Sequence, residues 1–290
     1  LAHALLYHGA EVRILDDLST GHRSNIPEKA TFIEGSILDK DAVTRAVEGC
    51  SVIFHEAAMV SVPESVAEPR RCFDVNVLGT KLVIDAARDA GTSRIVFASS
   101  AALYGADPQI PSTEQITGNL VSPYARSKSA GERLMQAATE FPAPYRISTV
   151  SLRYFNIFGP RQDPKSAYAA AIAAFADALT HGRAPTIYGD GGQTRDFTPV
   201  ANVVHANLLA ATTETNLRGE AVNIGTGRQI SLLDVINEMQ KVLGTNLTPV
   251  FEPVRAGDVR HSCPDITRAR ELLGYKPIMS FAQGIKQLLA

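Results

Sequence analysis

The stretch from residue 52 to residue 98 contains two strand-like runs and one helical run: VIFH at residues 52–55, FDVNVLGTKLVIDAARDA at residues 73–90 and RIVFA at residues 94–98. The middle run has apolar residues three and four positions apart over several turns, which is typical of an amphipathic helix. The flanking runs are short and mostly apolar, as strands of a sheet covered on both faces are. This stretch therefore predicts a βαβ unit.

The same alternation continues on both sides of this unit. We expect further strands at residues 11–15, 31–33 and 148–153, and further helices at residues 39–50 and 123–139. The pattern predicts an α/β fold with a doubly wound, Rossmann-like, mostly parallel sheet. Residues 1–9 have helical spacing and end in Gly9, so they look like the tail of a helix, and we expect the first strand and its Gly-rich turn to be missing.

Prolines become frequent after about residue 156, and shorter elements follow. Helices are expected at residues 167–181, 201–213, 232–243, 267–273 and 281–289. We therefore predict two domains, a dinucleotide-binding domain at residues 1–158 and a smaller α/β substrate lobe at residues 159–290, some segments of which return to the first domain.

The composition excludes several classes of partner. With 28 basic and 30 acidic residues the net charge is −2, so nucleic acid and anionic membranes are not expected to bind. The longest apolar run, at residues 167–176, is half as long as the roughly 20 residues that span a bilayer. The three cysteines, Cys50, Cys72 and Cys263, are widely spaced, which predicts free thiols, a cytoplasmic location and no metal site.

Tyr124 and Lys128 lie four residues apart in the helix expected after Pro123, so their side chains share one face. A phenol needs about 4 kcal/mol to ionise near pH 7, and an ammonium at about 4 Å can supply roughly that amount. We therefore expect Lys128 to lower the pKa of Tyr124, so that the phenol acts as a base. The spacing alone also occurs in proteins without this chemistry.

Two further residues stand at the carboxyl ends of predicted strands, where open α/β sheets bind ligands. Ser100 follows the strand at residues 94–98 and can pass a hydrogen bond between a substrate hydroxyl and Tyr124. Asp16 follows the strand at residues 11–15, where a carboxylate can bind a ribose diol and repel a 2′-phosphate. Asp16 favours NAD over NADP, although an aspartate after a strand is also an ordinary turn residue.

With these residues the sequence resembles the extended short-chain dehydrogenases/reductases of the NAD-dependent epimerase/dehydratase family. Within that family it resembles the UDP-hexose and UDP-N-acetylhexosamine 4-epimerases. The matching stretches cover essentially the whole chain: DDLS at 16–19, HEAA at 55–58, NVLGT at 76–80, SSAALYG at 99–105, YARSK at 124–128, LRYFNIFGPRQ at 152–162, TRDF at 194–197 and RAGDVR at 255–260.

The resemblance implies epimerisation of a UDP-sugar at carbon 4 through a transient 4-keto intermediate, with NAD as cofactor and with a homodimer formed through the helices around 73–90 and 123–139. It implies three catalytic residues: Ser100, Tyr124 and Lys128. The implied cofactor-binding residues are Asp16, Asp17, Ser36, Ile37, Ala57, Ala58, Asn76, Ser99, Tyr124, Lys128 and Tyr154. The implied substrate-binding residues are Ser100, Asn156, Tyr188, Arg195, Arg255, Asp258 and Ser262.

Several positions separate this sequence from neighbouring activities. Ala101 and Ala102 stand where 4,6-dehydratases usually carry an acidic pair, which disfavours dehydration and, less strongly, decarboxylation of a uronate. The resemblance implies that Ser262 faces carbon 2 of the sugar, where a serine leaves space for an N-acetyl group, although Ser262 is also an ordinary polar loop residue. Ser36 and Asn202 replace acidic residues that are usual in the family. A uronate epimerase, a reductase and an inert dinucleotide-binding scaffold stay open as alternatives.

Overall fold

A computed structural model describes residues 1–162, 171–254 and 259–290 of the chain. The chain divides into two compact units, and it passes between them more than once. The first unit contains Leu1–Leu103, Leu120–Arg153 and Ala206–Val222, and the second contains Tyr104–Asn119, Tyr154–His205 and Asn223–Ala290. The sequence placed the main boundary at residue 158 and let some later segments return to the first domain, and this division into domains stays a prediction.

Two local contacts explain the extra crossings. The backbone N–H of Ser112 donates to the carbonyl of Cys263 at 2.8 Å, which holds residues 104–119 in the second unit. Helix α8 (Val200–Thr212) ends in the first unit, where the guanidinium of Arg94 donates to the carbonyls of Ala210 and Ala211. A cation at the carboxyl end of a helix satisfies carbonyls that have no partner within the helix.

The first unit contains two sheets. One has four strands in the order β10-β5-β4-β3, and the other is the parallel pair β1-β2. Their bounds are β1 (Arg13–Asp16), β2 (Thr31–Glu34), β3 (Val52–His55), β4 (Arg94–Ser100), β5 (Ser148–Tyr154) and β10 (Arg218–Ile224). Strands β3 and β4 are parallel, as the predicted βαβ unit requires. Among the described residues no ladder joins β1 to β3, and the absence of a first strand stays a prediction.

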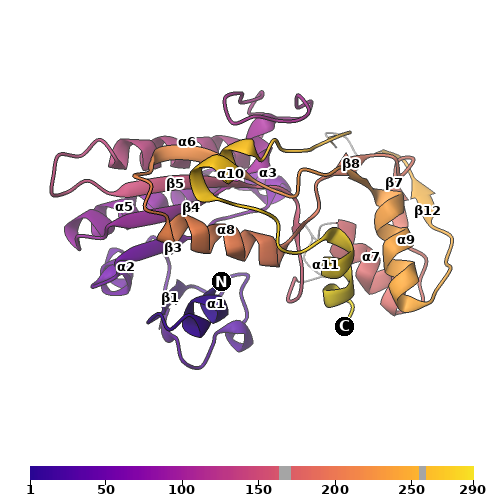
Figure 1. Ribbon diagram of the computed structural model, residues 1–290, viewed down its shortest axis with the longest axis horizontal. Helices are drawn as coiled ribbons and strands as arrows, with labels where there is room; N and C mark the ends of the chain where they lie inside the picture. The colour runs from indigo at the N-terminus through magenta and orange to yellow at the C-terminus, as the bar shows by residue number, and fades with distance from the viewer. Residues whose placement is uncertain (163–170, 255–258) are drawn as a thin grey trace. The chain divides into compact units, whose positions relative to one another are not determined.

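The helices of the first unit pack against one another and against these sheets. They are α1 (Ala2–Tyr7), α2 (Lys40–Val47), α3 (Val62–Ala67), α4 (Pro69–Phe73), α5 (Thr80–Asp89) and α6 (Pro123–Ala138). Helices α5 and α6 lie side by side along the sheet (Figure 1). Ile84 of α5, Phe97 of β4 and Met135 of α6 meet in one buried cluster. Short 3-10 turns occur at Arg23–Asn25 and Ala101–Tyr104.

The helix predicted at residues 73–90 is present and runs without a break to Asp89, but its middle differs from the prediction. Helix α4 begins earlier, and the segment η2 (Asp74–Gly79) between α4 and α5 is π-helical. Single π-turns inside helices occur often at functional sites. Helix α6 begins as predicted, because the Ser122 hydroxyl accepts a hydrogen bond from the Ala125 N–H and Pro123 occupies the first turn.

The second unit has three two-stranded sheets and a separate core. The pairs are β6 (Ile157–Phe158) with β9 (Thr198–Pro199), β8 (Thr194–Arg195) with β11 (Ile230–Ser231), and β7 (Thr186–Tyr188) with β12 (Val250–Glu252). The helices are α7 (Ala171–Thr180), α9 (Leu232–Leu243), α10 (Thr267–Leu273) and α11 (Phe281–Leu288). Phe175, Met239 and Ile285 bring α7, α9 and α11 together in the core. Helix α9 begins at a capping box of Ser231 and Asp234.

None of the helices in the described part of the chain combines the length and the apolar character that crossing a bilayer requires.

Candidate active site

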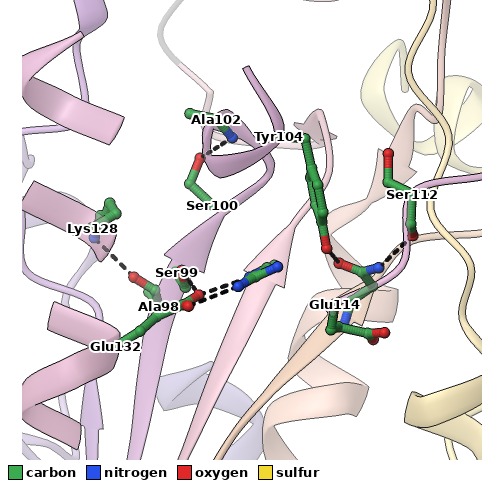
Figure 2. Close-up of polar contacts among 11 residues, drawn as sticks. Ala98, Ser99, Ser100, Ala102, Tyr104, Ser112, Glu114, Lys128 and Glu132 are labelled. Atoms are coloured by element: carbon green, nitrogen blue, oxygen red, sulfur yellow. Dashed lines mark hydrogen bonds and ion pairs between the residues drawn. The ribbon is translucent and has the colours of Figure 1, made fainter. Parts of the chain in front are cut away.

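The last two residues of β4 direct their side chains to different partners, as successive residues of a strand do. The Ser100 hydroxyl oxygen accepts a hydrogen bond from the N–H of Ala102 at 3.1 Å, and the hydroxyl lies near enough to the Tyr124 phenol to lower the pKa of that phenol. The Ser99 hydroxyl instead donates to Glu132 at 2.6 Å (Figure 2). Ser100 is therefore held by the turn that follows it and is available to the phenol, whereas the hydroxyl of Ser99 is already engaged.

Tyr124 and Lys128 are both buried, with 8% and 3% of their surface exposed. Lys128 Nζ donates to the carbonyl of Ala98 at 2.8 Å (Figure 2) and lies 5.1 Å from the centre of the Phe97 ring. The same atom lies 6.0 Å from the centre of the Tyr124 ring. Helix α6 and strand β4 thus bring the three predicted catalytic side chains together.

The prediction that Lys128 lowers the pKa of Tyr124 is wrong for the protein without a bound cofactor. Burial raises the pKa of Tyr124, and the hydrogen bond with Ser100 offsets only part of this rise. Burial also lowers the pKa of Lys128 to about 8. The physical reason is that both groups lose their water, while the ammonium donates to the Ala98 carbonyl instead of the phenol.

Three polar side chains outside the predicted site, Ser65, Cys72 and Ser127, lie around Tyr124 and Lys128. Ser65 of α3 accepts a hydrogen bond from the N–H of Tyr124 at 3.1 Å. Cys72 of α4 lies near both ionisable groups, since it affects the pKa of each. Its thiol donates to the Ser127 hydroxyl at 3.6 Å. Ser127 lies within the quoted Tyr–Lys motif, but nothing in the sequence connects Ser65 or Cys72 to it.

Asn76 supports the turn that follows β3. Its side chain accepts a hydrogen bond from the N–H of Met59 at 2.7 Å and donates to the Met59 carbonyl at 3.0 Å. It also donates to the Ser127 hydroxyl of α6 at 2.9 Å. Asn76 is therefore fully occupied in joining the turn at residues 56–60, which includes Ala57 and Ala58, to the helix that carries Tyr124. The π-helical segment that contains Asn76 places it there.

The groups at the carboxyl end of β1 fit a ribose diol. Asp16 is exposed, and its Oδ1 accepts a hydrogen bond from the N–H of Leu18 at 2.7 Å. Among the described residues its Oδ2 has no hydrogen-bond partner. Asp17 accepts from the N–H of Ser19 at 3.0 Å, so it shapes the turn. Ser36 likewise caps its own turn through the N–H of Leu38, at 3.2 Å.

The buried ammonium of Lys128 also fits a bound dinucleotide. It has three N–H donors and, among the described residues, one hydrogen-bond acceptor, the Ala98 carbonyl. A ribose diol beside it would provide the missing acceptors, so the residues present are compatible with NAD. Ile37, by contrast, belongs to a buried apolar cluster. It packs so closely against Gly79 that a Cβ added at that glycine would lie 2.6 Å from Ile37 Cδ1.

Two of the predicted substrate residues flank Thr194 in the second unit. The guanidinium of Arg195 donates to the Thr194 carbonyl at 2.9 Å, and the N–H of Ser262 donates to the same carbonyl at 3.1 Å. Ser262 is buried, with 8% of its surface exposed. This arrangement brings the arginine and the serine close together although they are far apart in the sequence.

The other predicted substrate residues are placed separately. Asn156 has a positive φ of 22°, which asparagine tolerates better than most residues, and its carbonyl accepts from the N–H of Thr198 at 3.1 Å. Tyr188 and Tyr154 are half-buried at the ends of β7 and β5. Arg255 and Asp258 lie outside the described residues.

Asp196, next to Arg195, was missed by the sequence analysis. Its fully buried carboxylate accepts hydrogen bonds from the N–H groups of Thr226, Gly227 and Arg228. Burial raises the pKa of this carboxyl in spite of these bonds. The carboxylate holds the turn at residues 226–228 against the segment that contains Arg195. The motif TRDF contains the residue, but only the structure shows what it binds.

The fold and the site define a class of protein, a Rossmann-like α/β enzyme with a serine, a tyrosine and a lysine at the carboxyl end of a parallel strand. Residues 1–225 match the model of the NAD dependent epimerase/dehydratase family. The chain belongs to this family.

Known relatives agree with this assignment. A UDP-glucose 4-epimerase of Mycolicibacterium smegmatis is 38% identical over 98% of this chain and 91% of its own length. A crystal structure of UDP-glucose 4-epimerase from Thermotoga maritima with UDP-glucose has a TM-score of 0.92 and 34% identity over 99% of this chain and 92% of that one. UDP-N-acetylglucosamine 4-epimerase from Methanobrevibacter ruminantium, in complex with UDP-N-acetylmuramic acid, has a TM-score of 0.90 and 33% identity over 97% and 89%.

These findings confirm three predictions: the α/β, Rossmann-like fold, NAD as the cofactor, and an NAD-dependent epimerase of the extended short-chain dehydrogenase/reductase type. The chain is a UDP-glucose 4-epimerase-like enzyme.

Proposed function

We propose that this protein interconverts UDP-sugars that differ at carbon 4, through a transient 4-keto sugar. The observation that supports this most directly is the meeting of Ser100, Tyr124 and Lys128 at the end of β4. A hydroxyl, a phenol and an ammonium in contact are sufficient to remove and return the proton of a sugar hydroxyl. NAD, when bound, supplies the hydride acceptor and donor for carbon 4.

Each catalytic residue has a distinct part in this proposal. Tyr124 takes the proton of the 4-hydroxyl, and Ser100 passes the hydrogen bond between that hydroxyl and the phenol. Lys128 would hold a ribose of NAD through the N–H donors that the Ala98 carbonyl leaves free. Because burial raises the pKa of Tyr124, the phenol requires a further positive charge before it can act as a base near pH 7, and the nicotinamide of NAD would supply one when bound.

We assign the remaining predicted residues by the chemistry that each offers. Asp16 binds the adenosine ribose, while Arg195 and Arg255 neutralise the diphosphate, for which a planar and permanently charged donor is well suited. Asp17, Ser36, Ala57, Ala58, Asn76, Ser99 and Tyr154 surround the cofactor, directly or through the turns that they hold, and Ile37 supports them from the core. Asn156, Tyr188 and Asp258 complete the binding of the nucleotide.

Two related activities are disfavoured by the residues that follow Ser100. Ala101 and Ala102 begin the 3-10 turn after β4, and neither side chain can transfer a proton. Elimination of water by a 4,6-dehydratase needs an additional acid and base, and so this position does not support it. Decarboxylation of a uronate is disfavoured for the same reason.

The substrate range includes N-acetylhexosamines. Ser262 is buried beside the Thr194 carbonyl, which Arg195 also contacts, so it lies close to one of the proposed diphosphate ligands. A small side chain there leaves room for a substituent at carbon 2. We propose that UDP-GlcNAc and UDP-GalNAc are substrates as well as UDP-glucose and UDP-galactose.

The protein functions as a homodimer in the cytoplasm. Two apolar side chains are exposed on the first of the predicted dimer helices. Phe73, at the end of α4, is 39% exposed, and Leu78, in the π-helical segment, is 48% exposed. All three cysteines are free, with Cys72 and Cys263 buried, which suits a reducing compartment.

The proposed function is tested by incubating the purified protein with NAD and each of the four UDP-sugars and following the 4-epimers by NMR. We expect epimers to form without net change in absorbance at 340 nm. Tyr124→Phe should retain UDP-sugar binding and lose about 10²–10⁴-fold in kcat, the usual contribution of a general base. Stoichiometric oxidation or reduction of the cofactor would instead identify a net dehydrogenase or reductase.

A further inference from the structure

Four consecutive residues of β4 each contact a different residue of α6. The contacts join Phe97 to Gly131, Ala98 to Lys128, Ser99 to Glu132 and Ser100 to Tyr124. The contact of Phe97 with Gly131 is part of helix packing. The contacts of Lys128 and Tyr124 belong to the catalytic group already described. The contact of Ser99 with Glu132 has no part in the proposed chemistry, although it lies next to Ser100 (Figure 2).

Glu132 lies on the same face of α6 as the two catalytic residues of that helix. Tyr124, Lys128 and Glu132 follow one another at intervals of four residues, which places each about one turn beyond the last. A helix transmits a shift or a rotation along its length, because its hydrogen bonds keep successive turns in register. A change in the position of Glu132 against β4 therefore changes where Tyr124 meets Ser100.

The carboxylate of Glu132 is held on both oxygens. Oε1 accepts hydrogen bonds from the Ser99 hydroxyl at 2.6 Å and from Arg153 Nε at 2.9 Å, and Oε2 accepts from Arg153 Nη2 at 2.9 Å. The side chain of Arg153 is 3% exposed and that of Glu132 is 14% exposed. A two-point contact between a guanidinium and a carboxylate fixes distance and orientation together, and its buried charges are costly to separate.

This ion pair connects the elements that carry the catalytic group. Glu132 belongs to α6, Ser99 to β4 and Arg153 to β5. The close approach of Gly131 to Phe97, where an added Cβ would lie 2.5 Å from Cζ, sets how near the helix comes to the strand. The Glu132 contacts set its position along the strand.

We propose that Glu132 is a positioning residue for the reaction at carbon 4, acting through Ser99, Arg153 and the register of α6 to hold Tyr124 against Ser100. The inference rests on the proposed function and deepens it. Glu132 itself reaches neither substrate nor cofactor in this account, so its removal should affect the rate of the chemical step and leave sugar-nucleotide binding nearly unchanged.

The test compares Glu132→Gln with Glu238→Gln, a matched change in an exposed ion pair with Lys241 on α9. For Glu132→Gln we expect kcat for 4-epimerisation to fall about 10–100-fold, as small misplacements of catalytic groups do, with the UDP-sugar KM within about twofold of wild type. Glu238→Gln should leave both constants unchanged. Circular dichroism and thermal unfolding measure the folded fraction of each variant.

A second readout separates positioning from loss of structure. The groups that face Tyr124 are Ser100 of β4, Lys128 of its own helix and Cys72 of α4. Because the Ser100 hydrogen bond lowers the pKa of Tyr124, a misaligned helix should move the acidic limb of the kcat–pH profile to higher pH. Ser99→Ala removes one of the Glu132 contacts and should give a smaller shift in the same direction.

The inference is overturned if folded Glu132→Gln has the kcat and pH profile of wild type, or if its loss of activity equals its loss of folded protein. It is also overturned if KM rises while kcat is unchanged. A wild-type protein that forms no 4-epimer from any UDP-sugar would overturn the proposed function itself, and the inference with it.

Discussion

At position 202 an amide makes contacts that a carboxylate cannot make. Asn202 Nδ2 donates to the carbonyl of Met279 at 2.8 Å, while its Oδ1 accepts from the N–H groups of Ile278 and Met279. The side chain is completely buried, so an aspartate there would face a carbonyl oxygen without a proton to share. This explains a residue for which the sequence offered no function: Asn202 fixes the segment before α11.

In the proposed reaction, we expect Ser262 to set the range of sugars. We expect Ser262→Tyr to lower kcat/KM for UDP-GlcNAc by about 100-fold or more, since a bulky ring beside carbon 2 would overlap the acetamido group at a cost of a few kcal/mol. The values for UDP-glucose should change by less than about tenfold. Ser262→Ala is the control and should retain both substrates. Equal losses on the two kinds of sugar would contradict the placement of this residue.

His55 makes the stability of the protein depend on pH. It is buried at the end of β3, where its Nε2 lies 2.8 Å from the Thr80 hydroxyl, whose own proton goes to the Asn76 carbonyl. Burial, and to a smaller extent Lys128, lowers its pKa from 6.5 to about 3. Between these values the unfolded chain binds the proton and the folded protein does not, so the neutral imidazole contributes stability above pH 6.5 that is lost as the pH falls.

The expected result is a decrease in the free energy of unfolding of up to about 1.4 kcal/mol per pH unit below pH 6.5 from this one group. Urea unfolding at pH 7 and pH 5 measures it. His55→Asn should be less stable than wild type at pH 7, and its stability should change less between the two pH values. An identical slope in both proteins would show that other groups cause the dependence.

At the scale of the elements, the approach of α6 to β4 depends on Gly131. A Cβ at this position would lie 2.5 Å from Phe97 Cζ and 2.9 Å from Cε1, and Phe97 is fully buried. We expect Gly131→Ala to destabilise the protein by about 1–3 kcal/mol, as overpacking of a buried contact does, in spite of the better helix propensity of alanine. The midpoint of urea unfolding measures this change.

The double variant Gly131→Ala/Phe97→Leu is the control for this contact. A shorter side chain at position 97 removes the overlap, so the two changes should be less destabilising together than the sum of their separate effects. Strict additivity would indicate that the helix and the strand do not meet at these residues.

At the scale of the whole molecule, the proposed homodimer would bury apolar side chains that are exposed on the helical segment around residues 73–90. Leu78 is 48% exposed and lies in the π-helical segment. We expect wild type to have the mass of a dimer by light scattering, and Leu78→Arg to be a folded monomer or a dimer weakened at least about tenfold, because a charge replaces buried apolar area. Val250→Arg, an equally exposed change on β12, should stay dimeric.

Much of the architecture followed from local patterns. The strands at residues 52–55 and 94–98 and the helix at Pro123 were predictable, because apolar periodicity, strand length and a proline at the start of a helix depend on neighbouring residues. The family followed from motifs of the same local kind, YARSK and LRYFN among them. For these features, residues close in the chain are sufficient to specify the structure.

The tertiary structure decided what each side chain contacts. The rise in the pKa of Tyr124, the π-helical turn that carries Asn76, and the meeting of Glu132 with Ser99 and Arg153 all depend on segments that lie tens of residues apart. Burial and charge depend on everything that surrounds a group, and sequence spacing contains no measure of either. The sequence by itself determined the class of fold and the set of reactive groups, and the packing of distant segments determined the electrostatic environment in which those groups act.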